Sequence, residues 1–151
     1  MKSKNPTDRM GVYHKLSDVP HRHRLARYRD RYEGRDVWAE WAAHVTERNS
    51  SQRYAAQLER TERAWKRLAA DWERHHALAT PAVVEAFATR ILERCTPVSA
   101  YQIYFTKLEA FYSWLQNHAH HPHVYHPVWM AAAAFESTEC IWNAKMERRS
   151  V

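Results

Sequence analysis

Basic side chains recur at intervals of seven along a segment with the pattern of an amphipathic helix. The basic positions are Arg53, Arg60, Arg67 and Arg74, and Arg63 and Lys66 extend their face. At about 100° per residue this face lies opposite the apolar stripe that contains Trp65. Guanidinium groups in such a row can bind phosphates and can read guanine edges in a DNA major groove. The alternative is a solvated face, because Glu59–Arg63 and Glu62–Lys66 have the spacing of stabilising ion pairs.

A second polar strip lies along the aromatic segment 96–116. It consists of Ser99, Gln102, Thr106 and Lys107. Gln102 and Thr106 are neighbours on a helical surface, and Ser99 lies one turn earlier. Hydroxyl and amide side chains of this kind can form hydrogen bonds with base edges. The alternative is the ordinary polar side of an exposed helix.

Five histidines crowd the loop 117–127, at positions 118, 120, 121, 123 and 126. Their spacing would allow two or three of them to reach one metal ion, which gives a metal-dependent regulator as a third hypothesis. No cysteine accompanies them, so we favour polar loop residues that gain positive charge below about pH 6.5. We therefore expect no metal and no other cofactor.

Known catalytic patterns are missing from the sequence. It has no paired-carboxylate motif, no HExxH and no recognisable Ser/His/Asp arrangement, and its two glycines exclude a Gly-rich phosphate loop of the usual type. Cys95 and Cys140 do not form a disulfide framework. The first twenty residues hold no apolar run, and the longest run, at 128–135, is far shorter than the roughly 20 residues of a membrane span. We expect a reduced, cytoplasmic protein that is not an enzyme and has no membrane partner.

Positive charge is concentrated at the beginning of the chain. Residues 1–36 hold ten basic and five acidic side chains, whereas residues 37–151 hold thirteen and twelve. A basic arm is suited to polyanions, with nucleic acid ahead of anionic membrane. The alternative is a solvated, disordered tail.

Helical patterns follow the arm. Asp36 is a good N-cap for a helix over 36–49, and Ser50 or Ser51 begins the arginine-bearing helix, near whose end His75 and His76 lie. Thr80-Pro81 begins a third helix, and Ser99 is the expected N-cap of a fourth. The segment 128–149 predicts one further, alanine-rich helix. The predicted fold is all-α: a compact four-helix bundle over 36–130, with a basic N-terminal arm over 1–35 that is partly disordered or a short helix, and a C-terminal helix or linker over 131–151.

The order of these motifs resembles the core-binding domain of tyrosine recombinases, the phage-integrase-like family with a SAM-like helical fold. The resemblance covers roughly residues 36–130. The matching residues are Ser51 to Trp65, Thr80, Val84, Phe87, Ser99, Tyr101 or Tyr104, Leu108, Phe111, Tyr112, Trp114 and Leu115. His126-Pro127 stands where the family commonly has Asn-Pro. The resemblance implies a SAM-like bundle that forms half of a clamp around duplex DNA, with its second and fourth helices facing the major groove.

The catalytic domain of those recombinases has no counterpart in these 151 residues, so strand cleavage is not implied. We expect a duplex DNA-binding protein, accessory to DNA recombination or integration or truncated from such an enzyme. Its DNA contacts would be Arg53, Arg60, Arg63, Lys66, Arg67, Ser99, Gln102, Thr106 and Lys107, and its protein partners a full-length recombinase or a second copy. The alternative is a protein-interaction module that docks or self-associates through the apolar C-terminal helix, which carries Trp129, Phe135, Ile141 and Trp142.

Overall fold

Helices make up the regular structure of residues 3–49 and 51–149, the part of the chain that the computed structural model describes. No strand occurs in these residues, which confirms the prediction of an all-α fold. Within the same residues, no helix combines the length and the apolar character that are needed to cross a bilayer.

Three of the main helices begin at the N-caps that the sequence predicts. Asp36 Oδ1 accepts a hydrogen bond from the Ala39 N–H, 3.0 Å away, at the start of α2 (Val37–Thr46). Ser51 caps α3 (Gln52–Asp71), and Thr80 caps α4 (Pro81–Leu92) in the same way. Each cap satisfies one backbone N–H that would otherwise have no partner in the first helical turn.

The fourth predicted helix is built from three pieces. They are α5 (Pro97–Ser99), a π-helical segment η5 (Ala100–Phe105) and α6 (Thr106–Asn117). The expected N-cap Ser99 is wrong, because Thr96 Oγ1 accepts the hydrogen bond from the Ser99 N–H. In the π segment the Thr106 N–H donates to Tyr101, five residues earlier. This wider turn leaves the Ile103 carbonyl to accept a hydrogen bond of 2.9 Å from Thr61 Oγ1 of α3.

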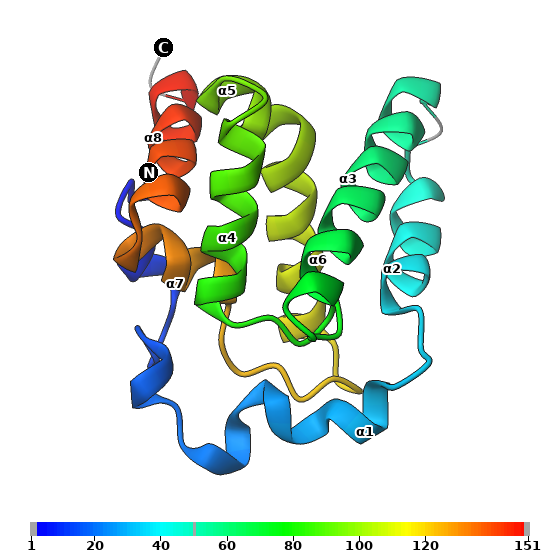
Figure 1. Cartoon of the computed structure of the whole chain (residues 1–151), viewed down its shortest axis with the longest axis vertical. Coiled ribbons are helices and arrows are strands. Elements are labelled where there is room, and N and C mark those ends of the chain that lie inside the picture. Colours follow the sequence, from blue (N-terminus) through cyan, green and yellow to red (C-terminus); the bar gives the residue numbers. More distant parts are fainter. Residues whose placement is uncertain (1–2, 50, 150–151) are drawn as a thin grey trace.

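Aromatic side chains fill the space between these helices. Trp38 and Trp41 of α2 pack against Phe111 of α6, and Trp65 of α3 packs edge-on against Phe87 of α4. All five of these side chains are buried. In Figure 1, α2 lies beside α3 on one side of the molecule, and the C-terminal helices lie beside α4 on the other.

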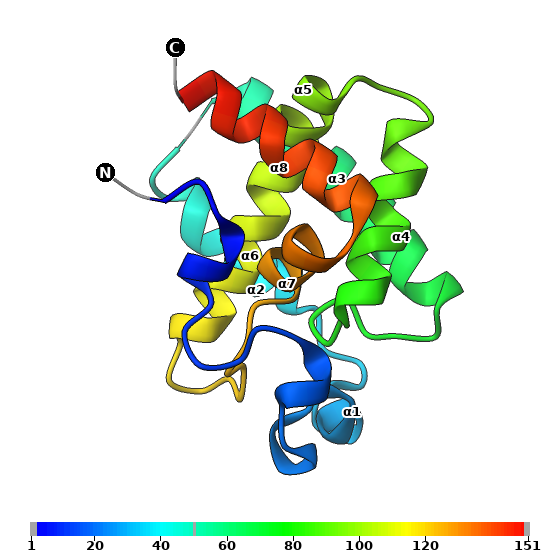
Figure 2. The same ribbon diagram turned by 90° about the vertical axis from the view of Figure 1, so that its left-hand side faces the viewer.

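The N-terminal arm, expected to be partly disordered or a short helix, is folded along most of its described length and includes a short helix. It forms four short 3-10 turns, η1 (Pro6–Arg9), η2 (Leu16–Asp18), η3 (His21–His23) and η4 (Leu25–Tyr28), and then α1 (Arg29–Tyr32). Met10, Val19, Leu25 and Tyr32 are buried in the same core as the bundle helices. The arm therefore runs across one end of the bundle and closes it (Figures 1 and 2). Burial of these four apolar side chains is the physical reason that the arm packs against the body.

The C-terminal segment forms two helices where one was predicted, α7 (Pro127–Ala134) and α8 (Glu136–Arg149). Phe135 has an extended backbone and separates them. The carboxylate of Glu85 on α4 accepts hydrogen bonds from the Ser137 and Thr138 N–H groups, at 2.9 and 2.8 Å, and so caps α8 from a distant part of the chain. The expected boundary after residue 130 falls within α7, and both helices pack on α4.

Replacing Glu85 tests this cap. Glu85→Ala leaves two N–H groups at the start of α8 without their acceptor, so we expect the free energy of unfolding to fall by about 1–3 kcal/mol. Urea unfolding measures the change. Glu59→Ala, an exposed glutamate of α3, is the matched control, and equal stability of the two variants would contradict the cap.

Candidate nucleic-acid interface

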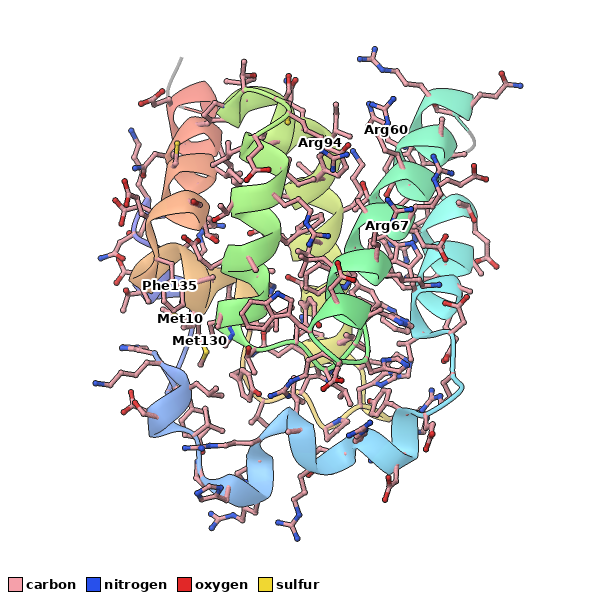
Figure 3. The ribbon with its side chains drawn as sticks, viewed as in Figure 1. Met10, Arg60, Arg67, Arg94, Met130 and Phe135 are labelled. Carbon is pink, nitrogen blue, oxygen red and sulfur yellow. The ribbon has the colours of Figure 1, made fainter. Side chains whose placement is uncertain are left out.

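A basic groove of about 700 Å³ lies between α3 and α4. Its lining residues are Arg60, Arg63, Ala64, Arg67, Arg90, Glu93, Arg94 and Tyr104. Five of them are arginines and one is a glutamate, so positive charge dominates the groove. Figure 3 shows Arg60 and Arg67 on α3 and Arg94 just after α4 near the gap between the two helices.

Helical spacing brings these arginines together. Positions 60, 63 and 67 of α3 share one face, because three and four residues correspond to about one turn. Arg90 and Arg94 have the same spacing at the end of α4. Tyr104 of the π segment completes the groove beside Ala64.

Most of these guanidinium groups are uncompensated. Arg60, Arg63, Arg67 and Arg94 are exposed, and no carboxylate among the described residues forms an ion pair with them. Arg90 is half-buried and pairs with Asp71 of α3, at 3.1 Å. The sequence analysis missed Arg90 and Arg94, although their spacing of four at the end of an amphipathic helix is a signal that could have identified them.

Lys66 does not line this groove. Its Nζ lies 2.8 Å from Asp36 Oδ1 and 2.5 Å from Glu62 Oε2, so two carboxylates compensate its charge. Although burial opposes it, hydrogen bonding to Asp36 and Glu62 raises the pKa of Lys66 above its usual value. The prediction that Lys66 extends the free basic face is therefore wrong. Arg53 is exposed at the start of α3, outside the residues that line the groove.

Lys107 is an internal residue. Only 5% of it is exposed, and its Nζ donates hydrogen bonds of 2.7 Å to Gln57 Oε1 and to the Gln102 carbonyl. Burial, together with the nearby charge of Arg53, lowers the pKa of Lys107 to about 8. Lys107 thus joins α3 to the π segment, and its expected place on an exposed polar strip is wrong.

The other members of that strip differ in exposure. Gln102 is exposed, whereas Ser99 and Thr106 are half-buried. Thr106 Oγ1 donates to the Gln102 carbonyl at 3.1 Å, which is the internal hydrogen bond that a helical threonine often makes. Only Gln102 therefore keeps the fully exposed position that the prediction gave to the strip.

The histidine-rich loop is largely buried, contrary to the expectation of charged loop residues. His121, His123 and His126 are buried, and burial lowers the pKa of each to about 4. His126 Nδ1 accepts the Trp129 N–H and caps α7, so this nitrogen carries no proton. His123 instead donates from Nε2 to the Ala77 carbonyl at 2.6 Å. Among the described residues, no three His, Cys, Asp or Glu side chains gather closely enough to hold a metal ion.

Stability should depend on these neutral histidines. Burial also lowers the pKa of His76 to about 3, and its Nε2 accepts the Trp38 N–H. In the unfolded chain each of the four takes up a proton near pH 6.5, whereas the folded chain resists protonation until about pH 4. The unfolded state thus binds more protons in this window, and the free energy of unfolding falls as pH decreases from 6.5 to 4.

We expect urea unfolding to show a loss of at least about 2 kcal/mol between pH 7 and pH 5. His126→Asn keeps a capping acceptor but cannot titrate, so it should make the profile shallower, while His76, His121 and His123 continue to contribute. His120→Gln, at an exposed position of the same loop, is the matched control. A stability that is constant between pH 7 and pH 5 would contradict burial of neutral histidines.

Comparison with models of known protein families, with curated protein sequences and with solved structures finds no match to this chain. The functional argument therefore depends on the charge and geometry of the groove between α3 and α4.

Proposed function

We propose that this protein binds duplex DNA through the groove between α3 and α4, without catalysing a reaction on it. One observation carries the proposal: arginines from two helices line a single groove, and four of them have no carboxylate partner among the described residues. Like charges held together in this way repel one another, and a polyanion relieves that repulsion.

Phosphate contacts would supply most of the binding energy. A guanidinium group forms two parallel hydrogen bonds with a phosphate, and each contact releases counterions from the DNA. Tyr104 and Ala64 form a less polar part of the lining, between the arginines. Such contacts position a protein on the duplex but carry little sequence information.

Base readout is assigned to the exposed amide of Gln102. This residue belongs to the π segment that packs against α3, and an amide side chain can form two hydrogen bonds with adenine in the major groove. Arg53, exposed at the start of α3, is a further phosphate contact in this proposal. Ser99 and Thr106 would contribute only through their remaining exposed surface.

The biological process in this proposal is DNA recombination or integration, with the chain as an accessory factor. This part is supported only by the order of sequence motifs, which resembles that of recombinase core-binding domains. α3 lies next to the segment 97–117, and under the resemblance these second and fourth helices would face DNA together.

Docking of a partner on the C-terminal helix has lost its original support. Ile141 and Trp142 are buried within the chain, and Trp142 Nε1 donates to the Lys4 carbonyl at 2.7 Å. Trp129 is half-buried and donates to Glu109. Of the apolar side chains that suggested a docking surface, Phe135 has the largest accessible fraction, 37%.

Titration with a mixed-sequence duplex of about 30 base pairs tests DNA binding. Engagement of about four phosphates predicts that affinity falls roughly 100-fold between 50 and 200 mM salt. The variant Arg60→Glu/Arg67→Glu should bind at least about tenfold more weakly at 50 mM salt and show a shallower salt dependence.

The matched control, Arg29→Glu/Arg48→Glu, makes the same change in net charge at exposed positions outside the groove. It should retain most of the affinity. Absence of binding at about 50 mM salt would contradict the DNA proposal, whereas an equal loss in both variants would contradict its assignment to the groove.

The variant Lys107→Met tests whether Lys107 stabilises the fold or contacts DNA. It removes the hydrogen bonds that Lys107 Nζ donates to the Gln57 side-chain oxygen and to the Gln102 carbonyl, of which, among the described residues, only the carbonyl keeps another donor, Thr106 Oγ1, so we expect the free energy of unfolding to fall by about 1–3 kcal/mol. Affinity for DNA, measured well below the melting temperature, should stay within about twofold of the wild-type value, because Lys107 is buried. If stability is unchanged and DNA binding is lost, Lys107 contacts DNA and its assignment as an internal residue is wrong.

A further inference from the structure

A second basic hollow, of about 510 Å³, lies where the N-terminal arm meets the base of the bundle. Its lining residues are Leu16, His21, Arg24, Ala26, Arg27, Arg74, Thr80 and Tyr125. Three are arginines, one is a histidine and none is a carboxylate. The hollow shares no lining residue with the groove between α3 and α4.

The arm presents two of these arginines in a fixed position. Arg24 precedes η4 and Arg27 lies within it, and the Leu25 N–H of η4 donates to the hydroxyl of the buried Tyr125 at 3.2 Å. Arg24 Nε donates to the Val19 carbonyl at 2.9 Å, which orients its guanidinium group. This side of the hollow is therefore held by specific hydrogen bonds.

Arg74 approaches from the opposite side, after the end of α3. Its N–H donates to Ala69 at 2.9 Å, and Glu73 before it has a positive φ of 54°. This is the geometry of a Schellman helix end, in which the left-handed position is usually glycine. The turn carries Arg74 off the helix axis and toward the arm, at a small backbone cost for a residue other than glycine.

Arg24 and Arg74 lie close enough to Tyr125 to act on its phenol, and Arg27 lines the same hollow. Burial raises the pKa of Tyr125, and the charges of Arg74 and Arg24 act in the opposite direction, as expected for cations close to the phenol. The side chains of Arg27 and Arg74 form no hydrogen bond or ion pair with any described residue. Three neighbouring cations in a partly enclosed site are unfavourable unless an anion joins them.

We propose that this hollow is a phosphate-binding site formed jointly by the arm and the end of α3. Arginine side chains match the geometry of phosphate oxygens, and Thr80 and His21 provide further polar groups in the lining. Leu16 and Ala26 give the site an apolar wall. The phosphate belongs either to a small phosphorylated compound or to the backbone of a nucleic acid. The proposal does not depend on the groove between α3 and α4.

Thermal unfolding of the full chain with inorganic phosphate and with pyrophosphate tests the site. Chloride at matched ionic strength serves as the reference. A ligand that binds only the folded state raises the melting temperature in a saturable way, and we expect a rise of about 3 °C or more. Arg27→Glu and Arg74→Gln should each abolish most of this rise. Arg48→Gln, at an exposed position outside the hollow, and the groove variant Arg60→Glu/Arg67→Glu should both retain it.

The outcomes separate this site from the DNA groove. No saturable stabilisation beyond the chloride reference, or a rise that survives both Arg27→Glu and Arg74→Gln, would overturn the proposal. If phosphate stabilises the chain and the two variants also weaken DNA binding at least about fivefold, the phosphate source is nucleic acid. If they leave DNA binding unchanged, or if the wild-type chain binds no DNA, the site is one for a small phosphorylated compound.

Discussion

Two hydrogen bonds, from Thr61 to the Ile103 carbonyl and from Lys107 to the Gln57 side chain, determine how α3 lies against the π segment and α6. Ile103 belongs to the π segment and Lys107 to α6, and both bonds reach across to α3. A buried carbonyl without a donor costs about 1–3 kcal/mol, so α3 must keep the rotation that presents Thr61 to the segment 100–105. That rotation leaves the arginine face beside Tyr104 and α4. The basic groove is thus a consequence of internal hydrogen bonding as much as of the arginine spacing.

At the other end of the bundle, hydrogen bonds between histidines and tyrosines hold neighbouring segments together. Tyr32 of the arm is bonded to His121, and Tyr112 donates to the His76 carbonyl while accepting the Ala79 N–H. The first bond joins the arm to the loop before α7, and the other two join α6 to the loop before α4. Because burial lowers the pKa of His121 to about 4, its neutral ring is part of the structure.

The parts of the fold that the sequence predicts correctly depend on residues close together in the chain. Asp36, Ser51 and Thr80 each cap the helix that follows, within three residues. The errors come from long-range partners: Glu85 caps a helix 52 residues later, and Lys107 is bonded to Gln57, which is 50 residues away. A charged side chain in a helical pattern gives no local sign of such a partner. The same limit applies to the groove. The periodicity of α3 predicted the arginines of one wall, but only the folded structure shows that Arg90 and Arg94 form the other wall.

The packing of the arm against late parts of the chain has a consequence for biosynthesis. Lys4, Leu25 and Tyr32 find their partners at Trp142, Tyr125 and His121, which are made about 90 to 140 residues later. The arm therefore leaves the ribosome long before these partners, and its apolar side chains stay unburied until most of the described chain has been synthesised. During that interval it is a basic, partly apolar segment beside an RNA-rich particle, and it is the region most open to proteases and chaperones.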